Sequence, residues 1–450
     1  MEITDLTFDD RDEFKRKKVA ENIISLLQAN IDISPMIIDG DWGTGKSEFC
    51  FKLINLMRES NSHHSIYINT FKADHANEPL MTVLAEVINV LPDKESKDSL
   101  IKNALPAIRY GLKTLAKAGV SHILRQDITD AVDDFDKDIQ DATDTIINSS
   151  IETMLKDHVE AEESLKTLQT ALSKIAKEKP IVIFIDELDR CRPNFATDML
   201  EVIKHVFDID NVSFVLITNV QQLKASINHY YGAINAQRYL DKFIKFATKL
   251  PSEHKANSHD FNKNSLAHYE QLIQESESLS QCELDEGPFL GLISDLISIH
   301  SISLRETETL VRHLEIYQAL TNNHGLAINN LGHKLLHLLG VAIYTFSPPL
   351  TKEFETEQLD AETLGAFLQE LEFKNFELDF DFGSPKAKQV LAVMLGQYSQ
   401  FSPKIFTPDS DTKKHWDRVI NDYFSSGSHP DADGYSKIVR KVIRTFSLSN

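Results

Sequence analysis

The segment from Gly40 to Ser47 has the clearest chemical meaning in this sequence. It reads G-D-W-G-T-G-K-S and fits the pattern G-x-x-x-x-G-K-[ST] at every fixed position. Glycines let the backbone curl so that successive N–H groups point inward, which is how proteins cradle phosphate groups. Lys46 is then expected to reach the β- and γ-phosphates of a nucleotide, and Ser47 to give its hydroxyl to Mg²⁺. The predicted phosphate-binding residues are Gly40, Asp41, Trp42, Gly43, Thr44, Gly45, Lys46, Ser47 and Glu48.

A pair of carboxylates, Asp186 and Glu187, follows the apolar run Ile181–Ile185. A short run of β-branched residues like this one is typical of a strand buried on both faces of a parallel sheet. We predict that Asp186 holds Mg²⁺ and that Glu187 orients and polarises the attacking water. Taken alone, the pair could equally be the N-cap of a helix. Together with the phosphate-binding segment it predicts hydrolysis of ATP with Mg²⁺.

Polar residues also follow two other predicted strands. Asn219, with Thr218 as the alternative, comes after a buried strand and is a candidate sensor of the γ-phosphate or of the attacking water. Asn69 follows the strand Ser65–Ile68 and could bond Glu187, holding it away from water until a partner docks. Asparagine is also common in turns, so a purely structural role is the alternative for both asparagines.

The elements that must position these residues alternate between helix and strand. Helical spacing of apolar residues or a helix-start signal predicts helices over 11–30, 47–57, 79–90 and 196–207, whereas short apolar runs predict strands at 37–38, 65–69, 181–185 and 212–218. This alternation indicates an α/β fold with a parallel sheet, in which the glycine-rich segment joins the first strand to the next helix.

Four regions are predicted along the chain. Residues 1–99 and 178–255 are the two halves of the α/β core, and residues 256–450 form a helical C-terminal region. Between the halves lies an insertion, residues 100–177, that begins as an amphipathic helix with basic residues and continues as an acidic tract. That tract, Asp127–Asp144, contains eight aspartates and reads as a solvated face, with docking to a basic partner as the alternative.

Composition narrows the class of protein. The 450 residues carry a formal charge of -21, so nucleic acid is expected as a partner only indirectly. Three cysteines without a Cys-x-x-Cys pair predict neither a disulfide framework nor a zinc site, as in a reducing cytoplasm. No apolar run approaches the roughly 18 residues that span a bilayer, and the first residues do not resemble a signal peptide. We therefore expect a cytoplasmic protein without a membrane span.

Four segments resemble the KAP-type P-loop NTPases. They are Gly40–Ser47, Tyr67–Phe71 followed by Glu78–Leu80, Ile185–Cys191, and Tyr239–Phe243 leading to Leu250–Pro251. The resemblance covers roughly residues 10–320, without most of the insertion. It implies a P-loop NTPase core of the ASCE type and a Mg²⁺-dependent ATPase whose cycle drives or gates an assembly.

The resemblance also bears on partners and biological role. It implies a homo-oligomer with a protein partner or effector, and bacterial members of the family are associated with defence against phage, a role that comes here by analogy. Two features depart from the family. Phe71 stands where a tryptophan is common, and the insertion stands where many members have paired transmembrane helices.

Arginines are candidates for completing the site. By position, Arg190, Arg192 and Arg238 could act as the finger that stabilises charge on the transferred phosphoryl group. Arg305 opens a predicted helix that resembles the family's sensor-2 segment and would reach the γ-phosphate from a helical lid extending to about residue 320. Arg16, with Asp12, resembles a segment that flanks the adenine. Surface positions or pairing with aspartates would explain these arginines equally well, and a solvated helix face would explain Arg16.

Two alternatives to a working ATPase remain. One is an ATP-clamped scaffold or regulatory subunit with slow or no turnover, which recruits a partner effector. The other is a phosphotransferase, against which Asp186 and Glu187 argue because kinases of this fold exclude water rather than activate it.

Overall fold

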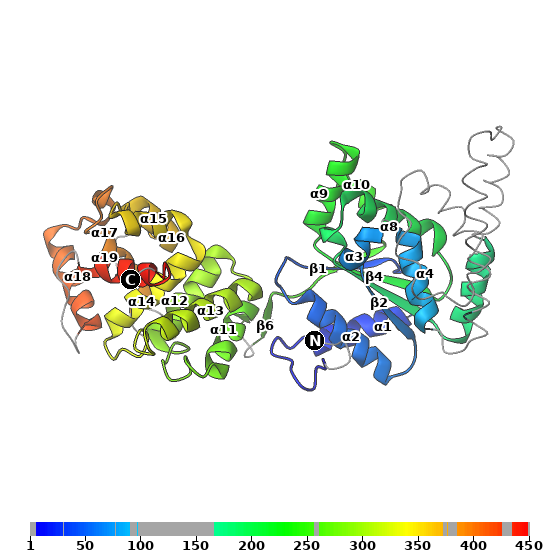
Figure 1. The fold of residues 1–450 in the computed structure, drawn as a ribbon, viewed down its shortest axis with the longest axis horizontal. Coiled ribbons are helices and arrows are strands. Elements are labelled where there is room, and N and C mark those ends of the chain that lie inside the picture. The colour runs from blue at the N-terminus through cyan, green and yellow to red at the C-terminus, as the bar shows by residue number, and fades with distance from the viewer. Residues whose placement is uncertain are drawn as a thin grey trace. The chain divides into compact units, whose positions relative to one another are not determined.

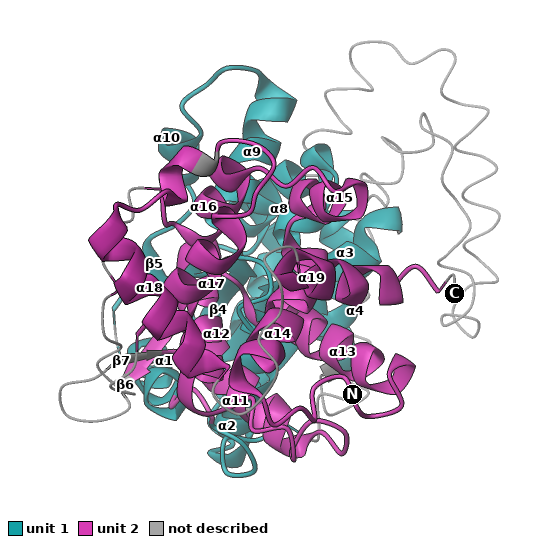
Figure 2. Cartoon of the chain, turned by 90° about the vertical axis from the view of Figure 1, so that its left-hand side faces the viewer, with its two compact units in different colours: residues 1–12, 16–251 teal, residues 13–15, 252–450 magenta. Residues whose placement is uncertain are grey.

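The computed structural model describes residues 6–29, 31–76, 78–90, 97, 166–255, 261–371, 376, 385–424 and 434–448. The chain forms two compact units, coloured separately in Figure 2. The first comprises Met1–Asp12 and Arg16–Pro251, and the second Glu13–Lys15 and Ser252–Asn450. The predicted insertion lies outside the described residues up to residue 165, and residues 166–178 are helical. The predicted region boundaries at 99, 177 and 255 stay predictions.

A five-stranded parallel sheet forms the centre of the first unit (Figure 1). Its strands lie in the order β2-β3-β4-β1-β5, and every neighbouring pair is parallel. They are β1 (Met36–Asp39), β2 (His64–Asn69), β3 (Ile181–Asp186), β4 (Val212–Thr218) and β5 (Phe246–Lys249). The predicted parallel α/β core is confirmed. The edge strand β5 was not predicted, because its side chains are mostly exposed and show no apolar run.

Strand β3 is buried on both faces, as its apolar sequence predicts. Its side chains alternate between two apolar clusters, because successive residues of a strand point to opposite faces. Ile181, Ile183 and Ile185 join the cluster formed with α4 (Pro79–Val90), α8 (Pro193–Val206) and α9 (Val220–Tyr231). Val182 and Phe184 join the cluster formed with α1 (Lys17–Gln28) and α2 (Lys46–Glu59). Helices thus cover both faces of the sheet.

Local signals fix where several of these helices begin. Gly45 adopts a left-handed conformation directly before α2. Pro193 occupies the first turn of α8, where its missing N–H costs nothing, so this helix begins before the predicted position at residue 196. Asn219 caps α9 by accepting hydrogen bonds from the N–H groups of Gln221 and Gln222.

The register of the strands brings the polar ends of the sheet together. Asn69 of β2 lies opposite Asp186 of β3, and Asp39 of β1 lies opposite Thr218 of β4. The carboxyl ends of parallel strands meet at one edge of a sheet, which is where ligands bind in open α/β folds. The polar residues predicted at the ends of these strands therefore converge at this edge.

Over its described residues, the second unit is mainly helical and has one apolar cluster. Its helices are α11 (Asn264–Glu275), α12 (Gly287–His300), α13 (Leu304–Leu320), α14 (Leu331–Phe346), α15 (Pro348–Thr356), α16 (Ala361–Leu368), α17 (Ala387–Gly396), α18 (Ser410–Tyr423) and α19 (Gly434–Thr445). An antiparallel pair, β6 (Glu253–Lys255) and β7 (Phe261–Lys263), precedes them and was not predicted. Where the chain is described, no helix combines the length and apolar character needed to cross a bilayer.

A short stretch from the beginning of the chain completes the second unit. Glu13 lies 3.1 Å from the ring of His268 on α11, measured from Oε1 to Nδ1. The ring of Phe14 meets the same histidine edge-on, with ring centroids 6.2 Å apart. His268 is buried, so this contact is part of the interior of the second unit.

Glu78 makes the stability of the first unit depend on pH. Burial, followed by repulsion from Asp198 of α8, raises the pKa of its carboxyl from 4.5 to about 7. Between these values the folded chain holds a proton that the unfolded chain has released, so the free energy of unfolding falls as the pH rises. We expect Glu78→Gln to flatten this slope, measured as the melting temperature across that pH range. The exposed Glu59→Gln is the matched control, and a slope unchanged in Glu78→Gln would contradict the prediction.

Candidate functional site

The phosphate loop, residues Gly40–Ser47, joins the end of β1 to the first turn of α2. Gly43 and Gly45 have φ values of 75° and 76°, a left-handed conformation that side chains with a Cβ rarely adopt. A Cβ at Gly40 would lie 3.0 Å from the Thr44 hydroxyl and 3.2 Å from the Lys46 side chain. The backbone conformation therefore favours glycine at Gly45, which the pattern fixes, and at Gly43, which the pattern leaves variable, while side chains crowd the space that a Cβ of Gly40 would occupy.

Lys46 points back into the phosphate loop. Its ammonium donates hydrogen bonds to the carbonyl oxygens of Gly40, at 2.6 Å, and Asp41, at 2.8 Å. Burial lowers the pKa of Lys46, while Asp189, followed by Asp186, opposes that shift. The loop thus contains a cation whose present acceptors are neutral carbonyls that an anionic phosphate could replace.

Asp186 lies at the carboxyl end of β3 with almost no solvent exposure. The Tyr67 hydroxyl donates to its Oδ2 at 3.0 Å, and the backbone N–H of Glu187 donates to its Oδ1 at 2.8 Å. Burial raises the pKa of Asp186, and hydrogen bonds from Ser47 and Tyr67 oppose the rise. A hydroxyl and a carboxylate in contact are the oxygen ligands that Mg²⁺ prefers, so Ser47 and Asp186 fit the predicted ion.

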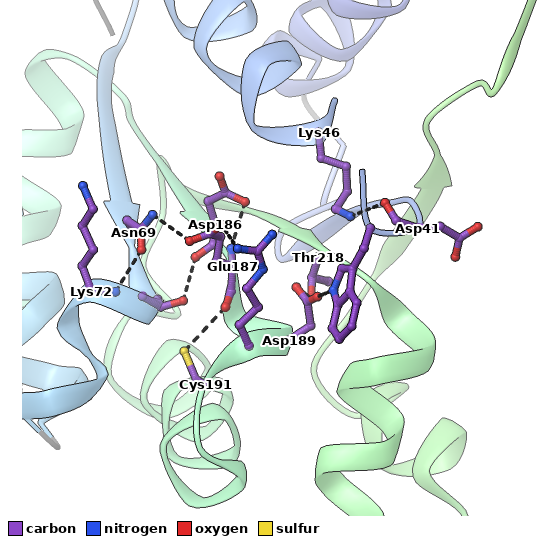
Figure 3. Close-up of polar contacts among 12 residues, drawn as sticks. Asp41, Lys46, Asn69, Lys72, Asp186, Glu187, Asp189, Cys191 and Thr218 are labelled. Atoms are coloured by element: carbon purple, nitrogen blue, oxygen red, sulfur yellow. Dashed lines mark hydrogen bonds and ion pairs between the residues drawn. The ribbon is translucent and has the colours of Figure 1, made fainter. Parts of the chain in front are cut away.

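Glu187 is held by two neighbours (Figure 3). The amide of Asn69 donates to its Oε2 at 3.0 Å, and the guanidinium of Arg190 lies 2.7 Å from its Oε1. Its own backbone has a φ of 63°, which is uncommon for a residue with a side chain. The predicted Asn69–Glu187 hydrogen bond is present, and the partner of Arg190 is Glu187 rather than Asp186 or Asp189.

The end of β4 lies against the phosphate loop. Asn219 uses its oxygen to cap α9, while its amide donates to Asp41 Oδ1 at 3.3 Å. The Thr218 hydroxyl donates to Asp189 Oδ1 at 3.0 Å. Asn219 is thus both a turn residue and a member of the site, and its role as a sensor stays a prediction.

The other predicted arginines lie in different surroundings. Arg192 pairs with Asp74, with 3.1 Å between its Nε and the carboxylate, which matches the alternative of a structural arginine. Arg238 lies exposed on α10 (Ala236–Leu240), and Arg305 lies in the first turn of α13 in the second unit. Their contacts with a nucleotide stay predictions.

Arg16 is not part of a solvated helix face, and that interpretation is wrong. Its side chain is buried, and it donates to the carbonyl oxygens of Thr44, at 3.0 Å, and Pro251, at 2.8 Å. The helical spacing of the surrounding residues could not reveal this, because both acceptors are backbone atoms from distant parts of the sequence.

Two contacts of the site were missed in the sequence. The Trp42 indole donates to Asp189 Oδ2 at 2.5 Å, and the Tyr67 hydroxyl bonds Asp186. Asp189 lies in the segment Ile185–Cys191 that resembles the KAP family, which indicates that the residue matters but not which residue it contacts. Tyr67 lies two residues before Asn69 on β2, so the alternation of a strand places both toward the same face.

Comparison with known families matches residues 16–321 to the KAP family P-loop domain. The chain belongs to this family. The predicted resemblance over roughly residues 10–320 is thereby confirmed, and family membership indicates nucleotide binding at the phosphate loop. The KAP match begins at Arg16 and ends just after α13, so it includes the first unit from Arg16 onward and the first three helices of the second unit.

One curated relative of this KAP protein is the Phage T7 exclusion protein of Escherichia coli (strain K12). The two sequences are 21% identical over 308 residues, which are 64% of this chain and 38% of that protein. The chain therefore spans well under half the length of this relative.

Tyr67→Phe is expected to weaken Mg²⁺ binding without disturbing the fold. The ring, which packs edge-on against Phe51 with centroids 4.8 Å apart, would remain, while the hydrogen bond that orients Asp186 would be lost. Removing such a partner of a metal ligand costs about tenfold in metal affinity. The measurement is the Mg²⁺ concentration that half-saturates nucleotide binding. Tyr239→Phe, on α10, is the matched control, and an unchanged requirement for Mg²⁺ in Tyr67→Phe would refute this role.

Proposed function

We propose that this KAP protein is a Mg²⁺-dependent ATPase that drives or gates an assembly. The observation that carries the proposal is the position of Glu187, next to Asp186 at the same sheet edge as the phosphate loop. A nucleotide binder needs the loop and a metal ligand, whereas a hydrolase also needs a carboxylate to accept a proton from water. Glu187 meets this need because its side chain is part-exposed and tethered beside Asp186.

Binding would begin with exchange of the partners of Lys46. Its ammonium would leave the carbonyls of Gly40 and Asp41 for the β- and γ-phosphates, while the N–H groups of the loop and the first turn of α2 face the same anion. Ser47 and Asp186 would hold Mg²⁺, which neutralises charge on the phosphates when bound. The positive end of α2 favours this anion further.

Hydrolysis would require Glu187 to become available. The water oxygen attacks the γ-phosphorus, the bond from that phosphorus to the bridging oxygen breaks, and Glu187 accepts the proton that water loses. In the described arrangement both oxygens of Glu187 already have partners, Asn69 and Arg190. Release from these partners is therefore part of the proposed cycle, and a freed Arg190 could then face the phosphoryl group.

The restrained Glu187 also favours the alternative of a slow, ATP-clamped scaffold. Two partners on Glu187 would keep this carboxylate from activating water, so the chain would hold ATP without hydrolysing it. The proposed wider role in defence against phage is supported by the name of the relative, Phage T7 exclusion protein. That the protein forms a homo-oligomer with a protein effector is proposed from the family resemblance alone.

The two functions differ in the effect of Glu187→Gln. For the ATPase we expect this variant to lower steady-state phosphate release by about 100-fold or more, since proton transfer contributes that much, while nucleotide binding persists. Lys46→Ala should abolish binding. The exposed Glu59→Gln controls for the loss of one charge. Equal rates in Glu187→Gln and wild type would remove Glu187 from the reaction, and a wild type that binds nucleotide without turnover would favour the scaffold.

Asn69→Ser is expected to raise basal phosphate release. A serine would still cap α3 (Thr70–Ala73), as Asn69 does by accepting the N–H of Lys72, but could not reach Glu187. A hydrogen bond to a charged group contributes about 1.5 kcal/mol, so a rise of up to roughly tenfold is expected. Asn69→Ala, which also loses the cap, is the comparison. Basal and partner-stimulated rates that stay unchanged in both variants would exclude Asn69 as a restraint.

A further inference from the structure

Trp42 connects the tip of the phosphate loop to a residue outside the loop. Its indole N–H donates to Asp189 Oδ2 at 2.5 Å, while 48% of the residue is exposed to solvent. An indole has a single hydrogen-bond donor, so this contact fixes which edge of the ring faces the protein. A large apolar side chain at this exposed position is therefore anchored by one polar contact.

Asp189 joins that contact to the sheet. It lies in the short 3-10 turn Leu188–Arg190, directly after Glu187, and is buried. Its second oxygen accepts the hydroxyl of Thr218, which is fully buried at the end of β4 (Figure 3). One carboxylate thus links the phosphate loop, the turn after β3 and the end of β4.

The proposed hydrolysis does not account for this carboxylate. Asp186 and Glu187 already supply the metal ligand and the proton acceptor, and Asp189 has both oxygens directed at protein donors. A buried carboxylate costs free energy unless it is hydrogen-bonded. Here one bond goes to the phosphate loop and the other to the end of β4, both next to the proposed phosphate site. A second link runs beside it, since Asn219 donates to Asp41 of the loop.

We propose that Asp189 is a positioning residue for nucleotide binding: it holds the loop tip, through Trp42, against the end of β4. The loop would thereby be kept in the described conformation, ready to receive the terminal phosphates of a nucleoside di- or triphosphate. This inference rests on the proposed nucleotide site, but not on hydrolysis. It also links the loop to Thr218 and Asn219, so displacement of the loop tip would affect the end of β4.

The Trp42–Asp189 contact can be observed directly by fluorescence. The chain has two tryptophans, and Trp416→Phe leaves Trp42 as the single emitter. In that background, Asp189→Asn keeps the side-chain volume but removes the charge and one of the two acceptors. We expect emission at longer wavelength and stronger quenching by iodide, because the indole loses its anchor. The exposed Asp208→Asn should leave both unchanged.

A double-mutant cycle tests whether this contact positions the loop. The affinities for ADP and for the non-hydrolysable analogue AMP-PNP are measured for Asp189→Asn, Trp42→Phe and the double variant. Each single variant should bind about tenfold more weakly, the size expected for a hydrogen bond to a charged group. If both act through one contact, the double variant should bind no more weakly than either single variant. Thr218→Val should also weaken binding of ADP and AMP-PNP, because it removes the hydroxyl that bonds Asp189.

Several outcomes would overturn the proposal. Effects that multiply in the double variant, or single variants with wild-type affinity, would show that the contact does not position the loop. Trp42 emission unaffected both by Asp189→Asn and by Asp189→Ala, which has no side-chain acceptor, would show that the contact is absent in solution. A different outcome would refute only the proposed hydrolysis. In it, the double-mutant cycle gives the expected result for Trp42 and Asp189, but Glu187→Gln releases phosphate at the wild-type rate. A wild type that binds neither nucleotide would refute both proposals.

Discussion

The site depends on a carboxylate that cannot be solvated. Asp186 ends a strand buried on both faces, so its oxygens must find donors within the protein. Those donors come from β2 through Tyr67, from the start of α2 through Ser47, and from the next backbone N–H. The need to satisfy one buried group therefore fixes how three separately encoded elements meet, and the positions of Lys46 and Glu187 follow from it.

The parts of this arrangement that are local could be predicted from the sequence. The glycines of the segment Gly40–Ser47 predict the loop, and the isoleucines of β3 predict a strand that is buried on both faces and ends at Asp186. What could not be predicted were side-chain contacts with distant backbone atoms and an edge strand without an apolar run. The carbonyl acceptors of Arg16 carry no side-chain signal, and β5 has none of the apolar pattern by which strands are recognised.

The family match and the structural units divide the chain differently. The KAP domain ends just after α13, whereas the second unit continues through α19 around a single apolar cluster. Helices α11–α13 share that interior with helices that the family match does not include. The later helices therefore belong to the same packed unit as Arg305.

Residues 13–15 make the second unit discontinuous in the sequence, and this affects the order in which the unit can fold during synthesis. They are synthesised before residues Arg16–Pro251 of the first unit, yet Glu13 and Phe14 can make their contacts only after His268 has been synthesised. The second unit is thus not encoded by one continuous stretch. A gene fragment that starts at Ser252 would express a body lacking part of its own interior, and a clean division of this chain into two polypeptides would need to supply that short N-terminal stretch as well.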